Sequence, residues 1–88
     1  MELFMVGTPE RPGTLHSALA CKVLRACGVP FLSRDVSDET LATAARTLSG
    51  FEFFPQLFIA GEFIGGTEMV VELAKSGQFS GAGAQRGR

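Results

Sequence analysis

The chain has 88 residues, of which 45% are apolar and 19% charged, and its formal net charge is −1. This length predicts one small domain, and this composition is typical of soluble globular proteins rather than of disordered chains. Because the net charge is small and no apolar run approaches the roughly 20 residues that span a bilayer, we expect neither nucleic acid nor a membrane as a partner.

The first half of the chain alternates between strand and helix patterns. In chain order we expect a strand, a helix, a strand and a helix at residues 2–6, 14–27, 29–36 and 37–50. A loop restricted by Pro9 and Pro12 precedes the first helix, and Ser37 or Asp38 can cap the second. The two strands should pair in parallel, since a helix connects them.

The second half of the chain predicts a hairpin followed by a helix. We expect two strands and a helix at residues 55–60, 63–66 and 67–77, with Thr67 as the cap of that helix. The order β-α-β-α-β-β-α predicts an α/β fold with a four-stranded mixed sheet and helices on both faces. Residues 1–79 should form this domain, and residues 80–88 should form a flexible C-terminal tail.

The two cysteines, Cys21 and Cys27, fall six positions apart on the first predicted helix. Six helical residues separate side chains by about 9 Å along the axis, whereas a disulfide needs Cα atoms within roughly 7 Å. We therefore expect two free thiols, which are typical of a reducing compartment such as the cytoplasm.

The start of the first helix, at Thr14 and Ser17, is the first candidate functional site. Free N–H groups and the helix dipole favour an anion or thiolate at such a position. The simpler interpretation is that Thr14 or Ser17 only caps the helix, and composition alone favours it.

Two further candidate sites lie in the second half of the chain. Pro55 opens a strand, where a cis peptide bond would mark a specific backbone geometry, although an ordinary trans proline is the simpler interpretation. Gly65, Gly66 and Thr67 join a strand to a helix and could hold a carboxylate, although a plain tight turn explains them equally well. In the predicted fold all three candidate sites could converge on one groove.

Three segments of the sequence together resemble one known family. The segments LFMVGTPERP, CGVPF and FPQLFIAGEFIGG are similar to those of the monothiol glutaredoxins, which have a thioredoxin-like fold. The resemblance covers nearly the whole chain and implies a groove that binds glutathione or a protein partner. In that family one cysteine, in a Cys-Gly-Phe-Ser motif, reacts with glutathione or ligates a shared [2Fe–2S] cluster.

Alignment to the family without gaps places this motif on residues 14–17, so that Thr14 stands where the reactive cysteine is expected and Ser17 is retained. A threonine hydroxyl is neither a nucleophile comparable to a thiolate nor a soft iron ligand. The resemblance therefore implies a redox-inactive member that binds no [2Fe–2S] cluster and holds no metal. Glutathione remains a candidate ligand.

The resemblance also assigns the groove to a set of residues, with several departures from the family. Val6 replaces a lysine that contacts glutathione, and Phe53 replaces a threonine that lies two residues before the cis-proline. The residues implied to bind glutathione are Arg46, Phe54, Pro55, Gly65, Gly66, Thr67 and Glu68. Phe53 could either fill this groove or offer an apolar patch to a partner.

Three functions stay open at this point. The leading hypothesis is a glutathione-binding, partner-binding or regulatory module without a catalytic thiol. The second is a working oxidoreductase or cluster carrier that uses Cys21 or Cys27, although both positions favour structural roles. The third is an anion or small-peptide site without redox chemistry. His16 could act as a base or a ligand, although a solvated residue in the first turn of the helix is the simpler interpretation.

Overall fold

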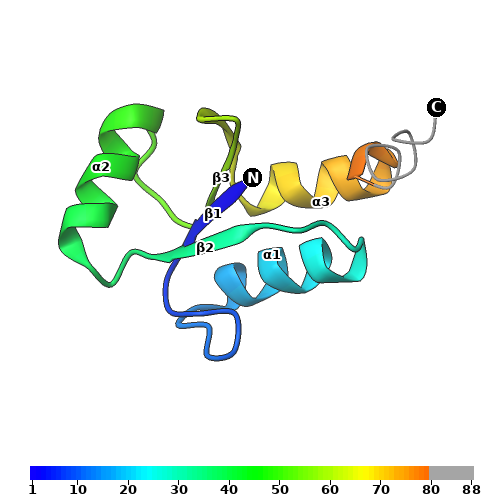
Figure 1. Ribbon diagram of the computed structural model, residues 1–88, viewed down its shortest axis with the longest axis horizontal. Coiled ribbons are helices and arrows are strands. Elements are labelled where there is room, and N and C mark those ends of the chain that lie inside the picture. The colour runs from blue at the N-terminus through cyan, green and yellow to red at the C-terminus, as the bar shows by residue number, and fades with distance from the viewer. Residues whose placement is uncertain (80–88) are drawn as a thin grey trace.

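The computed structural model describes residues 1–79 and contains the seven elements in the expected order (Figure 1). They are β1 (Glu2–Met5), α1 (Leu15–Ala26), β2 (Leu32–Asp35), α2 (Glu39–Ser49), β3 (Gln56–Ile59), β4 (Glu62–Gly65) and α3 (Thr67–Lys75). The predicted tail, residues 80–88, lies outside the described residues.

The four strands form one mixed sheet in the order β2-β1-β3-β4. β1 pairs with β2 in parallel, because α1 carries the chain back across the sheet between them. β3 runs antiparallel to both β1 and β4, so the hairpin completes the sheet. The mixed four-stranded sheet predicted from the sequence is therefore confirmed.

Helices cover both faces of this sheet, as predicted. In Figure 1, α1 and α3 lie together on one side of the sheet and α2 lies on the other. Successive residues of β1 alternate between two cores, since side chains of a strand point to opposite faces. One core, under α1 and α3, contains Leu3 and Met5, and the other, under α2, contains Phe4.

The ends of several elements differ from the sequence prediction. β2 begins at Leu32 rather than at residue 29, because only 32–35 pair with β1. Asp38 caps α2, accepting a hydrogen bond from the Thr40 N–H at 2.9 Å. Thr67, however, does not cap α3: Gly66 is the N-cap residue, and the Thr67 hydroxyl instead donates to the carbonyl of His16 at 3.2 Å.

Candidate functional site

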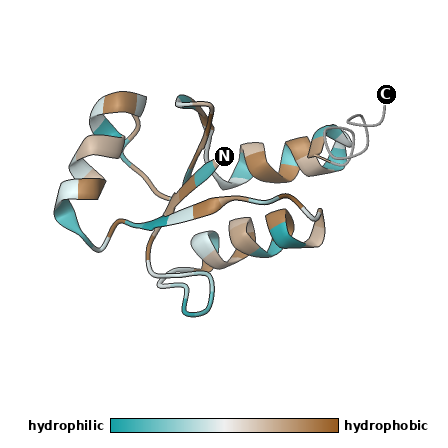
Figure 2. Ribbon diagram, in the orientation of Figure 1, coloured by the Kyte–Doolittle hydropathy of each residue, from teal (hydrophilic) through white to brown (hydrophobic). Residues whose placement is uncertain are grey.

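The loop between β1 and α1 is closed by its own backbone. The Thr8 and Arg11 N–H groups each donate to the other residue's carbonyl, at 3.2 and 3.0 Å, and Gly13 donates to the Val6 carbonyl at 2.7 Å. Gly7 has a φ of 88°, and a Cβ there would collide with the Arg11 carbonyl. The loop is hydrophilic (Figure 2), yet these contacts fix its path into α1.

A carboxylate beneath this loop anchors it to the sheet. Asp35, at the end of β2, accepts hydrogen bonds from the N–H groups of Gly7 and Ser37, each at 2.9 Å. These hydrogen bonds, led by the one from Ser37, lower the pKa of the Asp35 carboxyl. The ionised form of Asp35 therefore holds the start of the loop in place.

The loop delivers Thr14 to the N-cap position of α1, as the simpler interpretation predicted. Its hydroxyl oxygen accepts a hydrogen bond from the Ser17 N–H at 3.1 Å. Ser17 is fully buried, and its own hydroxyl accepts from the Val6 N–H at 3.0 Å. Thr14 and Ser17 thus join the loop, β1 and the first turn of α1 into one hydrogen-bonded unit.

The peptide bond between Phe54 and Pro55 is cis, as the family resemblance implied and in contrast to the simpler trans interpretation. The buried Gln56 side chain holds the segment before it, donating to the carbonyls of Phe51 and Phe53 at 2.7 and 3.1 Å. This contact turns the phenylalanine-rich segment back over the end of the sheet.

The turn between β4 and α3 packs closely against its surroundings. A Cβ at Gly65 would lie 2.5 Å from the Cβ of Met69, and one at Gly66 would lie 3.3 Å from the Pro55 carbonyl oxygen. Close packing therefore favours glycine at both positions, in addition to the needs of the turn. The hydroxyl of Thr67 ties this turn to His16 at the start of α1.

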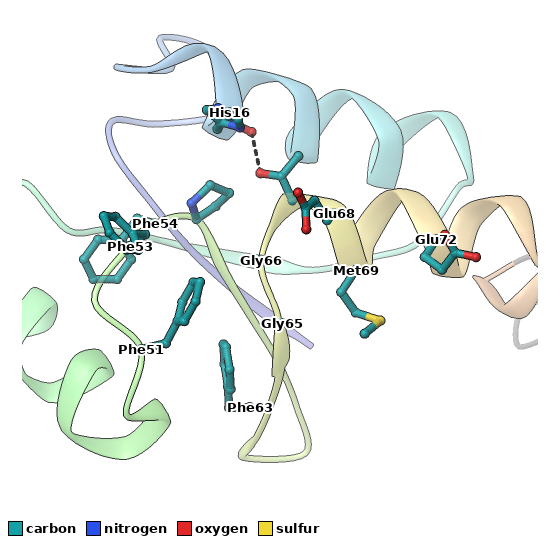
Figure 3. Close-up of a pocket in the computed structure, with 12 residues that line it drawn as sticks. His16, Phe51, Phe53, Phe54, Phe63, Gly65, Gly66, Glu68, Met69 and Glu72 are labelled. Atoms are coloured by element: carbon teal, nitrogen blue, oxygen red, sulfur yellow. Dashed lines mark hydrogen bonds between the residues drawn. The ribbon is translucent and has the colours of Figure 1, made fainter.

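A groove of about 780 Å³ lies where these segments meet (Figure 3). The Phe51, Phe53 and Phe63 rings form one side, and the start of α3 forms the other. Phe51 contacts both of the other rings, with centroids 5.8 Å from Phe53 and 5.6 Å from Phe63. The full lining comprises His16, Phe51, Phe53, Phe54, Pro55, Phe63, Gly65, Gly66, Thr67, Glu68, Met69 and Glu72.

Six of the nine site residues proposed from the sequence line this groove: Phe54, Pro55, Gly65, Gly66, Thr67 and Glu68. Thr14, Ser17 and Arg46 are not part of its lining. Arg46 is instead engaged on α2, where its guanidinium lies 5.1 Å from the centre of the Phe54 ring and 3.6 Å from the Glu39 carboxylate. Its Nε also donates to the Glu52 carbonyl at 3.1 Å.

Sequence reasoning did not assign several lining residues to a site. Phe51 and Phe63 belong to a phenylalanine cluster that is visible in the sequence, and that cluster was the available signal. Met69 and Glu72 gave no signal of their own, because only the direction of α3 brings them to the groove. Phe53 is 70% exposed, so it borders the groove as an apolar surface and does not fill it.

Neither cysteine belongs to the groove lining. Cys21 is 3% exposed, its thiol donates to the Met5 sulfur at 3.4 Å, and burial raises its pKa. Cys27 is the C-cap residue of α1, at the opposite end of the helix from Thr14, and is partly buried. Both thiols are free, as predicted.

Comparison with known proteins agrees with this architecture. Residues 3–64 match the glutaredoxin family model. The chain belongs to the glutaredoxin family. A probable monothiol glutaredoxin of Legionella pneumophila, GrlA, is 35% identical over 78 residues, which cover 88% of each protein. Monothiol glutaredoxin-S15 of Arabidopsis thaliana, a mitochondrial protein, is 40% identical over 78 residues, or 88% of this chain and 46% of that protein.

Solved structures of glutaredoxins share the thioredoxin-like fold. The mature form of Trypanosoma brucei 1CGrx1 is 31% identical, with a TM-score of 0.84 over 99% of this chain and 62% of that one. Reduced poplar apo GrxS14 is 34% identical, with a TM-score of 0.76 over 96% of this chain and 78% of that one. The chain spans less than half the length of the plant mitochondrial glutaredoxins it matches.

Proposed function

We propose that this glutaredoxin is a monothiol-type domain without a catalytic thiol, which acts as a glutathione-binding, partner-binding or regulatory module. The observation that supports this most strongly is the role of Thr14. Its side chain stands at the start of α1 and is engaged as a helix cap. A helix dipole contributes about 0.3–1 kcal/mol, which is far too little to ionise a threonine hydroxyl.

The residues of the groove do not fit an iron–sulfur cluster. Cluster iron is bound by thiolates, and the one sulfur atom in the lining is the Met69 thioether. Within residues 1–79, no three histidine, cysteine or acidic side chains gather closely enough to hold a metal ion. Within the same range, no helix is long and apolar enough to cross a membrane.

The alternative, a working oxidoreductase that uses another thiol, requires Cys21 or Cys27 to reach a substrate. Cys21 is enclosed by the core between α1 and the sheet, and its raised pKa disfavours the reactive thiolate. Cys27 lies at the end of α1 that carries the negative pole of the dipole. Neither environment favours nucleophilic chemistry, so we rank this function second.

Two measurements test the proposal. In a disulfide-reduction assay with glutathione, the protein should show no turnover above the glutathione background. In an NMR titration with millimolar glutathione, binding should shift the amides of Gly65, Gly66 and Glu68. Turnover that disappears in Cys21→Ser or Cys27→Ser would overturn the proposal that the domain has no catalytic thiol. Cluster absorbance after reconstitution with iron and sulfide would also overturn it.

A further inference from the structure

The groove combines an apolar surface with an acidic border, and this pairing indicates its ligand. We propose that it binds a segment of a partner protein in which a lysine or arginine neighbours an aromatic or aliphatic side chain. The inference rests on the proposed function and names the chemistry of the partner.

Three large apolar side chains of the groove are exposed to solvent. Phe53 is 70% exposed, Met69 39% and Phe51 38%, which are high values for large apolar side chains. The contacts of Phe51 with its neighbouring rings fix the orientation of the cluster, while Met69 can adapt to different shapes. A contiguous exposed apolar surface of this kind is typical of a binding site for another protein.

The border of the groove carries negative charge. Glu68 and Glu72 are exposed and one helical turn apart on α3, so their carboxylates lie on the same side of the helix (Figure 3). Neither carboxylate forms an ion pair with a side chain of residues 1–79. No lysine or arginine from this part of the chain lines the groove.

The one guanidinium on α2, that of Arg46, forms no ion pair with Glu68 or Glu72. Arg46 is directed toward Glu39 and the ring of Phe54, and its Nε donates to a backbone carbonyl. A cationic side chain from a partner would therefore meet two carboxylates that no side chain of residues 1–79 pairs with, beside aromatic rings, whose faces also attract cations. Its apolar neighbour would cover Phe53 and Met69.

The same charges weigh against a strongly anionic ligand. The uncapped N-terminus of α3 at Gly66 can receive one carboxylate. Glutathione carries a second carboxylate, which finds no basic side chain in the described lining. Glutathione should therefore bind only weakly, at the millimolar concentrations of the NMR titration, and less tightly than a cationic ligand. Among ligands of similar size, we therefore expect the groove to select for positive charge.

A titration with matched peptides tests this selection. The probe is a capped peptide, acetyl-Gly-Ala-Phe-Lys-Phe-Ala-Gly-amide, compared with the same peptide carrying Gln or Glu in place of Lys. Binding is measured by isothermal titration calorimetry and located by NMR. Each exposed ion pair contributes a factor of roughly 1.5 to 5 in affinity, so the Lys peptide should bind roughly tenfold more tightly than the Glu peptide.

Variants separate the contributions of charge and apolar surface. The double variant Glu68→Gln with Glu72→Gln should remove the preference for lysine, whereas Glu62→Gln, an exposed residue outside the lining, should keep it. Phe53→Ser should weaken binding of all three peptides at least several-fold. Leu48→Ser is the matched control: it changes a side chain on α2 that is 71% exposed, and it should leave the binding of all three peptides unchanged.

Several outcomes would overturn the inference. Equal affinities for the Lys and Glu peptides, or no measurable binding of any of them, would contradict it. So would a protein that self-associates through Phe53 and thereby occupies the groove with a second copy, detected by sedimentation. The redox assay is independent: thiol turnover with intact peptide selectivity would refute the proposed function alone, and lost selectivity without turnover would refute this inference alone.

Discussion

A cysteine introduced at position 14 should become a reactive thiol. In Thr14→Cys, the new sulfur would stand at the N-cap of α1, where the Ser17 N–H now donates to the threonine oxygen at 3.1 Å. The first turn of α1 contains no acidic residue that would oppose a thiolate. The helix terminus should therefore stabilise the ionised form by about 0.3–1 kcal/mol.

This free energy corresponds to a roughly two- to fivefold larger ionisation constant, which lowers the pKa of the new thiol. The assay is the rate of alkylation by iodoacetamide as a function of pH, in a Cys27→Ser background. Leu48→Cys is a matched control, since it places an exposed thiol in the last turn of α2, at the negative end of a helix dipole. The thiol at position 14 should titrate at lower pH than this control.

A thiol at position 14 that titrates at or above the control pH would refute the reasoning. That result would mean that the N–H groups at the start of α1 are not available to an anion. Far-UV circular dichroism of each variant should first establish that the helices are intact, because cysteine is a poorer cap than threonine. The same variant would show how much of the family's chemistry the remaining site still supports.

Three further predictions concern the supporting structure. Hydrogen bonds lower the pKa of Asp35 below its ordinary value of 3.8. The stability that the ionised carboxylate contributes should therefore be present above that pH and lost as the pH falls below it. The urea midpoint of unfolding should fall over this pH range, and it should fall less in Asp35→Asn. Gly65→Ala should cost about 1–3 kcal/mol by forcing its Cβ onto Met69, seen as a lower melting temperature, and an unchanged value would contradict the packing. In the native protein Cys21 should react with a bulky thiol reagent much more slowly than Cys27, and equal rates before unfolding would show that the core opens.

Hydrophobic periodicity was sufficient to predict the architecture. The pattern around β1 and the helix that follows it leaves few alternatives, because a helical crossover imposes a parallel pair. The ends of elements were less predictable: residues 29–31 are apolar enough for a strand but find no partner beyond the start of β1. The prediction that Thr67 caps α3 was wrong, because the tight glycine turn places Thr67 already inside the helix.

The groove was predicted only in part, for a related reason. Glycine, proline and the phenylalanine cluster are visible as local signals, so the loops that build the groove could be found. Whether a side chain points into it depends on tertiary packing, as Arg46 illustrates. That residue was proposed as a glutathione contact, yet its guanidinium lies on Phe54 beside α2, outside the lining. The wall formed by Met69 and Glu72 depends on how α3 crosses the sheet.

The loop before α1 has a wider consequence for how this site can change. Its shape depends on backbone hydrogen bonds and on the Asp35 carboxylate, and none of these contacts uses the side chain of residue 14. Any residue that can cap a helix could therefore occupy that position while the approach to it stays as it is. The side chain at position 14 is in this sense separable from the path of the loop, so a single substitution there can change the group that the loop presents while the loop keeps its shape. The scaffold would present serine, asparagine or aspartate at the same point as readily as it presents threonine.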